Sequence, residues 1–486
     1  MSGSNRRAVL GGLGGFLATS LWAPGVDAER RGSAFRATDD PHLPNRGAWE
    51  HLDEHIKANW QHEVASSSEE RIRADKSGQL LFVPFPYVDE FGAPSEVGIL
   101  WAWDMDFLCR GLLAHERFDL ARNLILDHLF MIERFGFVPN GNALSMKTRS
   151  QTPLTADTVW RFCEATGDRE LLYQAYPLLK VNYRDYWNAP HHQTPIGLAT
   201  NRDLGDPALP PALAAEAETG LDWTPIFGGD VRRCVPILTN CALVRYARVL
   251  ARMATTLSHN DEAREFREDA EHRAALVRKY CWNESVGYFL EYDYVGANQL
   301  SCLSDCAFWT LWARIATPDQ ARRLVQNLYR IEKPFGIACT DKAYPQPLPD
   351  GAYEFPGSMN SNGKPAVMKG VPTYAVGGQG QLQWMYPAGW PPMQIIVAEG
   401  LDMYGFGGDA TRLAAHFLWM VIKEYGETGL VWEKYNVAGG TIALPNSRYG
   451  VVPNFGWTKA AVAVLGRRLF LGEQLTLKPC QVHGSP

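Results

Sequence analysis

Two acidic residues lie in segments whose neighbours favour opposite protonation states. Asp222 follows the turn-forming Gly220 and precedes Trp223, and packing against an apolar ring raises the pKa of a carboxyl and retains its proton near neutral pH. Glu433 lies between aromatic residues and beside Lys434, whose charge favours the ionised carboxylate that a general base requires. Either residue alone is more often a turn residue or part of a surface ion pair. Together they supply the acid and the base that hydrolysis of a glycosidic bond needs.

Three further strings of residues resemble signatures of the trehalase family. Residues 136–142 and 148–153 read GFVPNGN and TRSQTP, similar to the trehalase pattern in which Gly-Phe-Ile-Pro-Asn-Gly-Asn precedes Arg-Ser-Gln-Pro. Residues 383–392, QWMYPAGWPP, resemble the second trehalase signature, and residues 101–104, WAWD, resemble the end of the first. The resemblance runs in family order over most of the chain, with further matches at residues 218–223, 433–436 and 455–458.

The resemblance implies an (α/α)6 fold and an inverting mechanism, with Asp222 as general acid and Glu433 as general base. It also implies a set of residues that bind the glucosyl unit whose bond breaks: Trp103, Asp104, Asn140, Arg149, Gln151, Gly220, Trp384 and Trp390. The residue types suit this role, because a guanidinium offers a rigid donor fork to sugar hydroxyls, a carboxylate accepts from them and indoles stack on the ring. The implied reaction needs no metal and no organic cofactor.

The chain departs from the trehalase pattern at positions expected to recognise substrate. The first trehalase signature carries an arginine shortly before its Trp-Asp end, whereas residues 94–98 here read PSEVG, and Met385 and Ala388 stand where trehalases usually have Asp and Asn. The leading hypothesis is hydrolysis of α,α-trehalose, or a close small α-glucoside, with release of glucose. The alternatives are a glycosidase for another compatible solute, such as glucosylglycerate or mannosylglycerate, and an exported sugar-binding protein that has lost catalysis.

Helices must position these segments, because helical periodicity dominates the chain. The predicted helices follow one another in pairs. The sequence predicts a first pair at residues 104–118 and 119–135. Further pairs are predicted at 156–166 with 168–187, 235–257 with 260–281, 302–315 with 318–331, and 392–404 with 409–425, before a last helix at 455–469. So many helices without βαβ alternation or a Pro- or Ser-rich linker predict one all-α (α/α)6 toroid rather than a string of domains.

Four long segments between the helix pairs lack helix signals: 80–100, 188–234, 335–381 and 437–454. Loops of this length are uncommon in a compact domain unless they have a function. We expect them to gather at one mouth of the toroid and form the pocket. Residues 288–292, YFLEY, alternate in polarity and predict a short strand.

The first residues predict export from a bacterial cell. Arg6 and Arg7 precede an apolar, glycine-rich stretch, and residues 26–28, VDA, form a small-residue cleavage site. We expect residues 1–28 to be a Tat-type signal peptide that is removed. Residues 29–486 should then form one catalytic domain, periplasmic or secreted and free of the membrane.

Composition and charge indicate which kinds of partner the protein can bind. The formal net charge is −6 and no block of Lys and Arg stands out, so no electrostatic footprint for nucleic acid is present. Sixteen Trp and nineteen Tyr provide flat rings that suit a small saccharide, and we expect a monomer. Nine dispersed cysteines favour buried thiols over disulfides or zinc ligands; Cys302 and Cys306, four apart on an expected helix, are poorly spaced for a bridge.

Overall fold

The computed structural model describes residues 40–92, 98–207, 209–344, 382–444, 447–448 and 450–475. By its contacts the chain divides into Met1–Phe35 and Arg36–Pro486, and every described residue belongs to the second unit. The expected signal peptide, residues 1–28, lies outside the described residues. Within them, no helix is long and apolar enough to cross a membrane.

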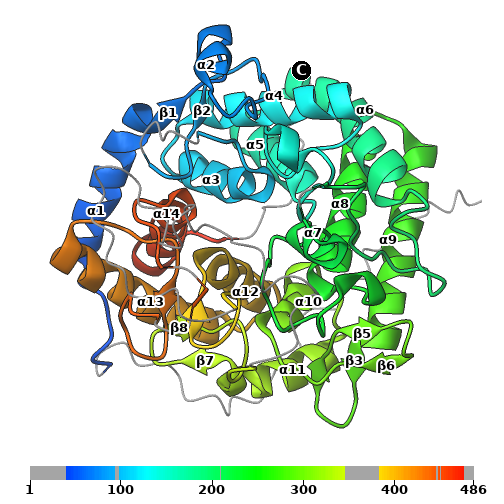
Figure 1. Ribbon diagram of the computed structural model, residues 1–486. Coiled ribbons are helices and arrows are strands. Elements are labelled where there is room, and N and C mark those ends of the chain that lie inside the picture. The colour runs from blue at the N-terminus through cyan, green and yellow to red at the C-terminus, as the bar shows by residue number, and fades with distance from the viewer. Residues whose placement is uncertain are drawn as a thin grey trace, which may run out of the picture. The chain divides into compact units, whose positions relative to one another are not determined.

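Six helices form a closed inner ring (Figure 1). In chain order they are α3 (Ala102–Ala114), α5 (Thr155–Thr166), α8 (Ile237–Thr256), α10 (Trp309–Trp312), α12 (Pro391–Met403) and α14 (Gly456–Leu471). Each packs against the next, and α14 packs against α3, which closes the circle. Neighbouring elements surround these inner helices on most sides, so their residues are buried all round. In α3, every residue from Ala102 to Leu112 is buried.

Six further helices form the outer layer (Figure 1). They are α1 (Arg46–Asn59), α4 (Phe118–Phe135), α6 (Arg169–Val181), α9 (Asn260–Cys281), α11 (Pro318–Gln326) and α13 (Gly407–Thr428). The predicted all-α (α/α)6 toroid is therefore confirmed. Sequence analysis missed α1, although its buried Trp49, Leu52 and Ile56 have helical spacing and Asn45 caps its first turn.

Short elements connect the two layers. The remaining α-helices of the described residues are α2 (Glu69–Ala74) and α7 (Pro211–Ala217). The strands pair antiparallel as β1 (Val64–Ala65) with β2 (Tyr87–Val88), β3 (Trp282–Asn283) with β4 (Tyr288–Phe289), β5 (Tyr292–Asp293) with β6 (Asn298–Gln299), β7 (Glu332–Lys333) with β8 (Gly336–Ile337), and β9 (Ala388–Gly389) with β10 (Tyr435–Asn436).

Two local predictions are corrected. The predicted strand at residues 288–292 is two strands, β4 and β5, because the chain leaves one hairpin and enters another between them. The helix predicted at 302–315 is a single turn of 3₁₀-helix followed by the four-residue α10, whose Trp309 and Trp312 are fully buried. Cys302 precedes both and shares no helix face with Cys306. Each cysteine in the described residues is a free thiol.

A buried ion network ties four inner helices together. Arg110 of α3 donates to Glu399 of α12 at 2.6 Å, and Arg245 of α8 donates to Asp157 of α5 at 2.7 Å. Arg161 of α5 reaches both carboxylates. Although burial opposes ionisation, the three guanidiniums hold the pKa of Asp157 below its usual range.

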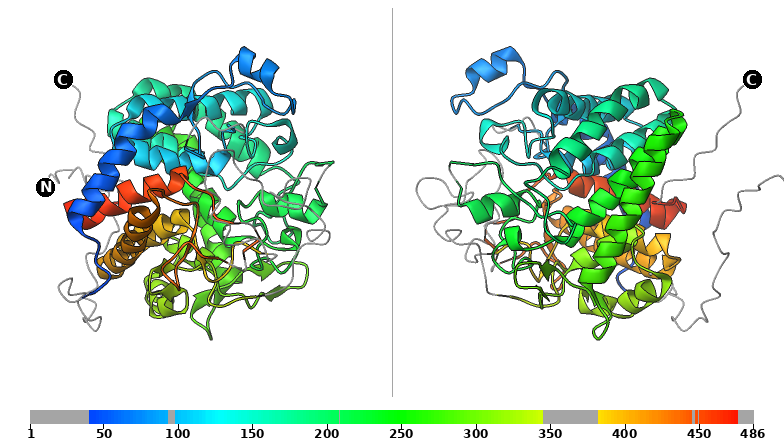
Figure 2. Two further views of the ribbon diagram at one scale, coloured as in Figure 1. Left: turned by 60° about the vertical axis from the view of Figure 1, so that its left-hand side comes forward. Right: turned by 90° about the vertical axis from the view of Figure 1, so that its right-hand side faces the viewer.

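Backbone hydrogen bonds join three of the long segments, or residues directly beside them, whereas the gathering of all four at one mouth stays a prediction. Phe335 N donates to Val437 O at 3.0 Å, Arg448 N to Leu382 O at 3.0 Å, and Gln383 N to Trp223 O at 2.9 Å. Residues 93–97 and 345–381 of the expected loops lie outside the described residues. The loop 188–234 with its helix α7 projects at one edge of the helical ring (Figure 2, right).

Candidate active site

The N-terminal ends of three inner helices carry aromatic and acidic residues to one place. Trp103 and Asp104 lie in the first turn of α3, Trp390 directly precedes α12, and Trp457 lies in the first turn of α14. A helix N-terminus carries a partial positive charge that stabilises nearby carboxylates. The loops that enter these helices therefore deliver the candidate site to one mouth of the ring.

Four indoles form a continuous aromatic wall. Trp384 and Trp390 stack with ring centroids 3.8 Å apart and planes 9° apart. Trp103 lies 5.8 Å from Trp384, and Trp457 lies 5.5 Å from Trp390. Three of these indoles, Trp103, Trp384 and Trp390, belong to the predicted set. The fourth, Trp457, lies in the matching string 455–458, for which no role was predicted.

The loop that carries Asp222 is pressed against this wall. Gly220 has φ +80°, and a Cβ there would lie 2.8 Å from the Trp103 ring, so both the backbone conformation and the close approach require glycine. Trp223 also has a positive φ, 56°, a strained conformation for a bulky residue that is common at functional sites.

Glu218 anchors the loop that carries Asp222 through several hydrogen bonds. Its carboxylate accepts hydrogen bonds from Ser150 N at 3.2 Å, His192 Nε2 at 3.0 Å and Arg202 N at 2.8 Å. Burial opposes ionisation, but His192 and the other donors hold the pKa of Glu218 below its ordinary value. Of the two carboxylates that flank Gly220, this one has a positioning role.

Asp222 has the environment of a general acid. Burial, with a further contribution from the charge of Glu433, raises its pKa to about 6. Gln383 Nε2 donates to Asp222 Oδ2 at 2.8 Å, which makes that oxygen an acceptor and leaves the other oxygen to carry the proton. Gln383 is the first residue of the string 383–392 that resembles the second trehalase signature, but its type alone predicts no role.

Glu433 lies beside a buried cation. Lys434 Nζ donates to Glu433 Oε2 at 2.9 Å, and Trp457 Nε1 donates to the backbone oxygen of Glu433 at 2.7 Å. Lys434 is itself buried and lies 4.8 Å from the centre of the Trp390 ring. The base, its cation and the aromatic wall form one unit.

Asp104 lies within electrostatic range of both residues. Burial first, and then the charges of Glu433 and Asp222, raise its pKa to about 8. Glu90, which sequence analysis missed, is a buried neighbour whose pKa burial and Asp104 also raise; it accepts from Trp457 N at 2.8 Å. A mouth with this many carboxyls retains protons near neutral pH because ionising all of them is unfavourable.

The other predicted residues support the site in different ways. Gln151 Oε1 accepts from Trp103 N at 3.0 Å, and Asn140 Nδ2 donates to Ser150 O and Ala217 O. Both therefore join loops.

Arg149, the predicted hydroxyl clamp, is buried. Its Nη1 donates to Asp203 at 3.1 Å and to Asp206 at 2.7 Å. These two carboxylates lie more than fifty residues further along the chain, where no local motif predicts them.

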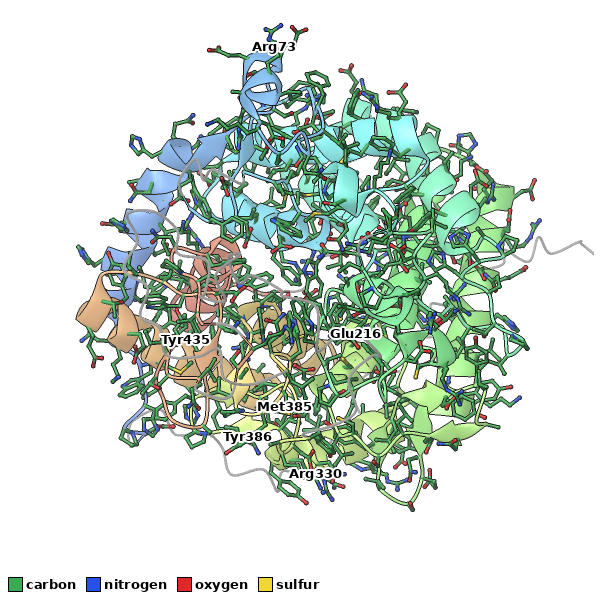
Figure 3. The ribbon with its side chains drawn as sticks, in the orientation of Figure 1. Arg73, Glu216, Arg330, Met385, Tyr386 and Tyr435 are labelled. Carbon is green, nitrogen blue, oxygen red and sulfur yellow. The ribbon has the colours of Figure 1, made fainter. Side chains whose placement is uncertain are left out.

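An apolar cluster lies beside the acid. Leu213, Trp223 and Leu382 form it, and Met385 packs against it, which explains how a methionine occupies a position where trehalases usually have a carboxylate. Figure 3 shows Met385 and Glu216 toward the middle of the ring and Arg73 at its outer edge. The guanidinium of Arg448 lies 4.4 Å from the centre of the Trp223 ring, and its charge lowers the pKa of Asp222 against the effect of burial.

Comparison with known families identifies the family of the chain. Residues 99–458 match the family model of the mannosylglycerate hydrolase MGH1-like glycoside hydrolase domain. The chain belongs to this glycoside hydrolase family. The matched residues include Asp222, Glu433 and all four indoles of the aromatic wall.

Trehalases are among the relatives of this glycoside hydrolase. A probable trehalase of Saccharomyces cerevisiae is 26% identical over 441 residues, which cover 78% of this chain and 52% of the relative. A periplasmic trehalase of Xanthomonas campestris is 26% identical over 483 residues, which cover 90% of this chain and 76% of the relative. The chain thus spans about half the length of the yeast relatives that it matches.

Solved structures share the fold. Neutral trehalase Nth1 from Saccharomyces cerevisiae has a TM-score of 0.65 and 22% identity, covering 89% of this chain and 88% of that one. A GH63 mannosylglycerate hydrolase from Thermus thermophilus, solved with glucose, has a TM-score of 0.57 and 16% identity, covering 85% of this chain and 99% of that one. The arrangement of helices is therefore one already seen in glycoside hydrolases.

Proposed function

We propose that the protein hydrolyses the α-glucosidic bond of α,α-trehalose, or of a close small α-glucoside, with inversion and release of glucose. The observation that carries the proposal is the pairing of Asp222, whose pKa is raised to about 6, with Glu433, whose carboxyl lies 2.9 Å from the buried ammonium of Lys434. One group can give a proton while the other takes one, as glycoside hydrolysis requires.

In the proposed reaction, Asp222 donates its proton to the bridging oxygen and the glycosidic bond breaks. Glu433 takes a proton from a water that attacks the anomeric carbon from the opposite face. Inversion requires room for that water, with carboxyls about 6.5–9.5 Å apart. Indoles of the aromatic wall would cover the apolar face of the sugar, and Asp104, protonated near neutral pH, would donate to a sugar hydroxyl.

A substrate screen tests the proposal directly. The purified protein is assayed for glucose release from trehalose and from other α-glucosides, and the first anomer released is identified by proton NMR. Inversion of trehalose should release equal amounts of β-glucose, from the ring that water attacks, and α-glucose, from the ring that leaves. Release of α-glucose alone would refute inversion, and saccharide binding without turnover would support the sugar-binding alternative instead.

Two isosteric variants test the roles. Asp222→Asn and Glu433→Gln preserve shape and remove proton transfer, so each should reduce kcat by about 10²–10⁴-fold. The matched controls are Asp261→Asn and Glu427→Gln, whose side chains are 92% and 59% exposed and should leave kcat unchanged. Near-normal activity of either site variant would overturn the assignment.

Glucosylglycerate and mannosylglycerate are the second candidate substrates. Arg448 lies close enough to Asp222 to affect its pKa, and the leaving group departs from the side of the acid, so a carboxylate on the leaving group would meet a guanidinium. If the substrate is such an anion, Arg448→Gln should raise its KM strongly. If the substrate is trehalose, the same variant should raise KM little.

We further propose that residues 1–28 direct export and that residues 29–486 act as one monomeric catalytic domain. The twin-arginine pair carries the first part of the proposal. Replacing Arg6 and Arg7 with lysine should retain the enzyme inside the producing bacterium, and N-terminal sequencing of the exported protein should begin at residue 29. The molecular mass of the mature chain, measured by analytical ultracentrifugation, tests whether it is a monomer.

A further inference from the structure

A cluster of metal-binding side chains lies on the outer layer, outside the candidate active site. Asp40 and His42 belong to the segment before α1, and His416 lies on α13. One donor atom from each of the three lies within 4.8 Å of the other two. His416 Nε2 is 2.7 Å from Asp40 Oδ2, and His42 Nδ1 is 3.9 Å from Asp40 Oδ1.

We propose that Asp40, His42 and His416 form a site for a divalent transition metal, zinc in the first instance. Two imidazoles and one carboxylate are a donor set that zinc accepts, with a fourth position left for water. Zinc bonds of about 2.0–2.2 Å place tetrahedral ligand atoms roughly 3.3 Å apart. The donor atoms here lie between 2.7 Å and at most 4.8 Å apart, a range that includes this value.

The surroundings suit a site of this kind. The three side chains are 18%, 32% and 13% exposed, in the order of the chain, so an ion can enter from solvent. The His42 ring makes edge contacts with Phe335 at 4.9 Å and Trp419 at 5.1 Å. These rings limit water on one side and fix the plane of the imidazole, as the outer shell of a metal site does.

The ligands come together only in the folded chain. Asp40 and His416 are 376 residues apart in sequence, so the unfolded chain has no such site and binding must stabilise the native state. A bound ion would clip the segment that precedes α1 onto α13. This role is independent of sugar hydrolysis.

The test uses tag-free protein titrated with Zn²⁺ after treatment with a chelator. We expect one ion per chain by calorimetry and elemental analysis, and a higher Tm with zinc than with chelator. His42→Asn, His416→Asn and Asp40→Asn should each weaken zinc binding by at least about 10–100-fold, the loss that removal of even an outer-shell partner causes. His51→Asn, at an exposed histidine of α1, is the matched control and should bind like the parent.

Two outcomes would overturn the proposal. One is parent protein that takes up no zinc or gains no thermal stability from it. The other is equal zinc uptake by the parent and the three site variants, which would indicate adventitious binding elsewhere. A purely structural Asp40–His416 contact predicts that His416→Asn lowers the Tm in chelator while zinc leaves the Tm of the parent unchanged.

Discussion

Replacing Asp222 with asparagine should reduce activity and, above about pH 6, increase the stability of the folded protein. The variant cannot donate the proton, and it has no buried carboxylate to ionise. The pKa of Asp222 is about 6 in the folded protein, against an ordinary value of 3.8. The folded state therefore binds this proton more tightly than the unfolded state, and the stability it contributes is fully present below pH 3.8 and is lost as pH rises through about 6. The difference between the two pKa values corresponds to roughly 3 kcal/mol.

Asparagine has no charge to bury, and its side-chain oxygen can still accept from Gln383. The variant and the parent should therefore have equal free energies of unfolding near pH 4. Above pH 6 the variant should be more stable, by up to roughly 3 kcal/mol at pH 7.5.

The assay is urea unfolding followed by tryptophan fluorescence at several pH values between 4 and 8, with kcat measured on the same samples. Asp261→Asn, at a 92% exposed side chain, is the control and should follow the parent at every pH. Parallel stability curves for the parent and Asp222→Asn would refute the reasoning, since the carboxyl would then titrate alike in both states.

Three further predictions concern other parts of the molecule. Gly220→Ala places a Cβ 2.8 Å from the Trp103 ring at a φ of +80° and should destabilise the protein by about 1–3 kcal/mol, measured by urea unfolding, with a parallel loss of kcat/KM. Arg448→Gln removes a charge that lowers the pKa of Asp222, so the alkaline limb of kcat/KM, which falls as the acid deprotonates, should move to higher pH; an unmoved limb would separate Arg448 from the acid. Glu399→Gln leaves the buried guanidiniums with one carboxylate fewer and should cost about 3–5 kcal/mol in urea unfolding, with kcat unchanged under native conditions.

The sequence by itself determined the helical layers and the candidate chemistry. Helix pairing follows from a 3.6-residue repeat of apolar positions, which is local information, and the missed α1 carries the same repeat at Trp49, Leu52 and Ile56. The prediction of Asp222 and Glu433 rested on their immediate neighbours and on ordered motifs. Local spacing misled at α10, which covers only Trp309–Trp312, and Arg314, two residues further on, has a positive φ of 54° that no α-helix contains.

Only the tertiary structure decided which side chains act on one another. Gln383 contacts Asp222 across 161 residues of sequence, and the aromatic wall joins Trp103 to Trp384 and Trp457 from three helices or loops far apart in the chain. Residue type predicts what a group can bind but leaves the choice of partner open. That choice depends on how the ring of helices closes, because closure sets which loops meet at one mouth and how far water is excluded from the carboxyls there.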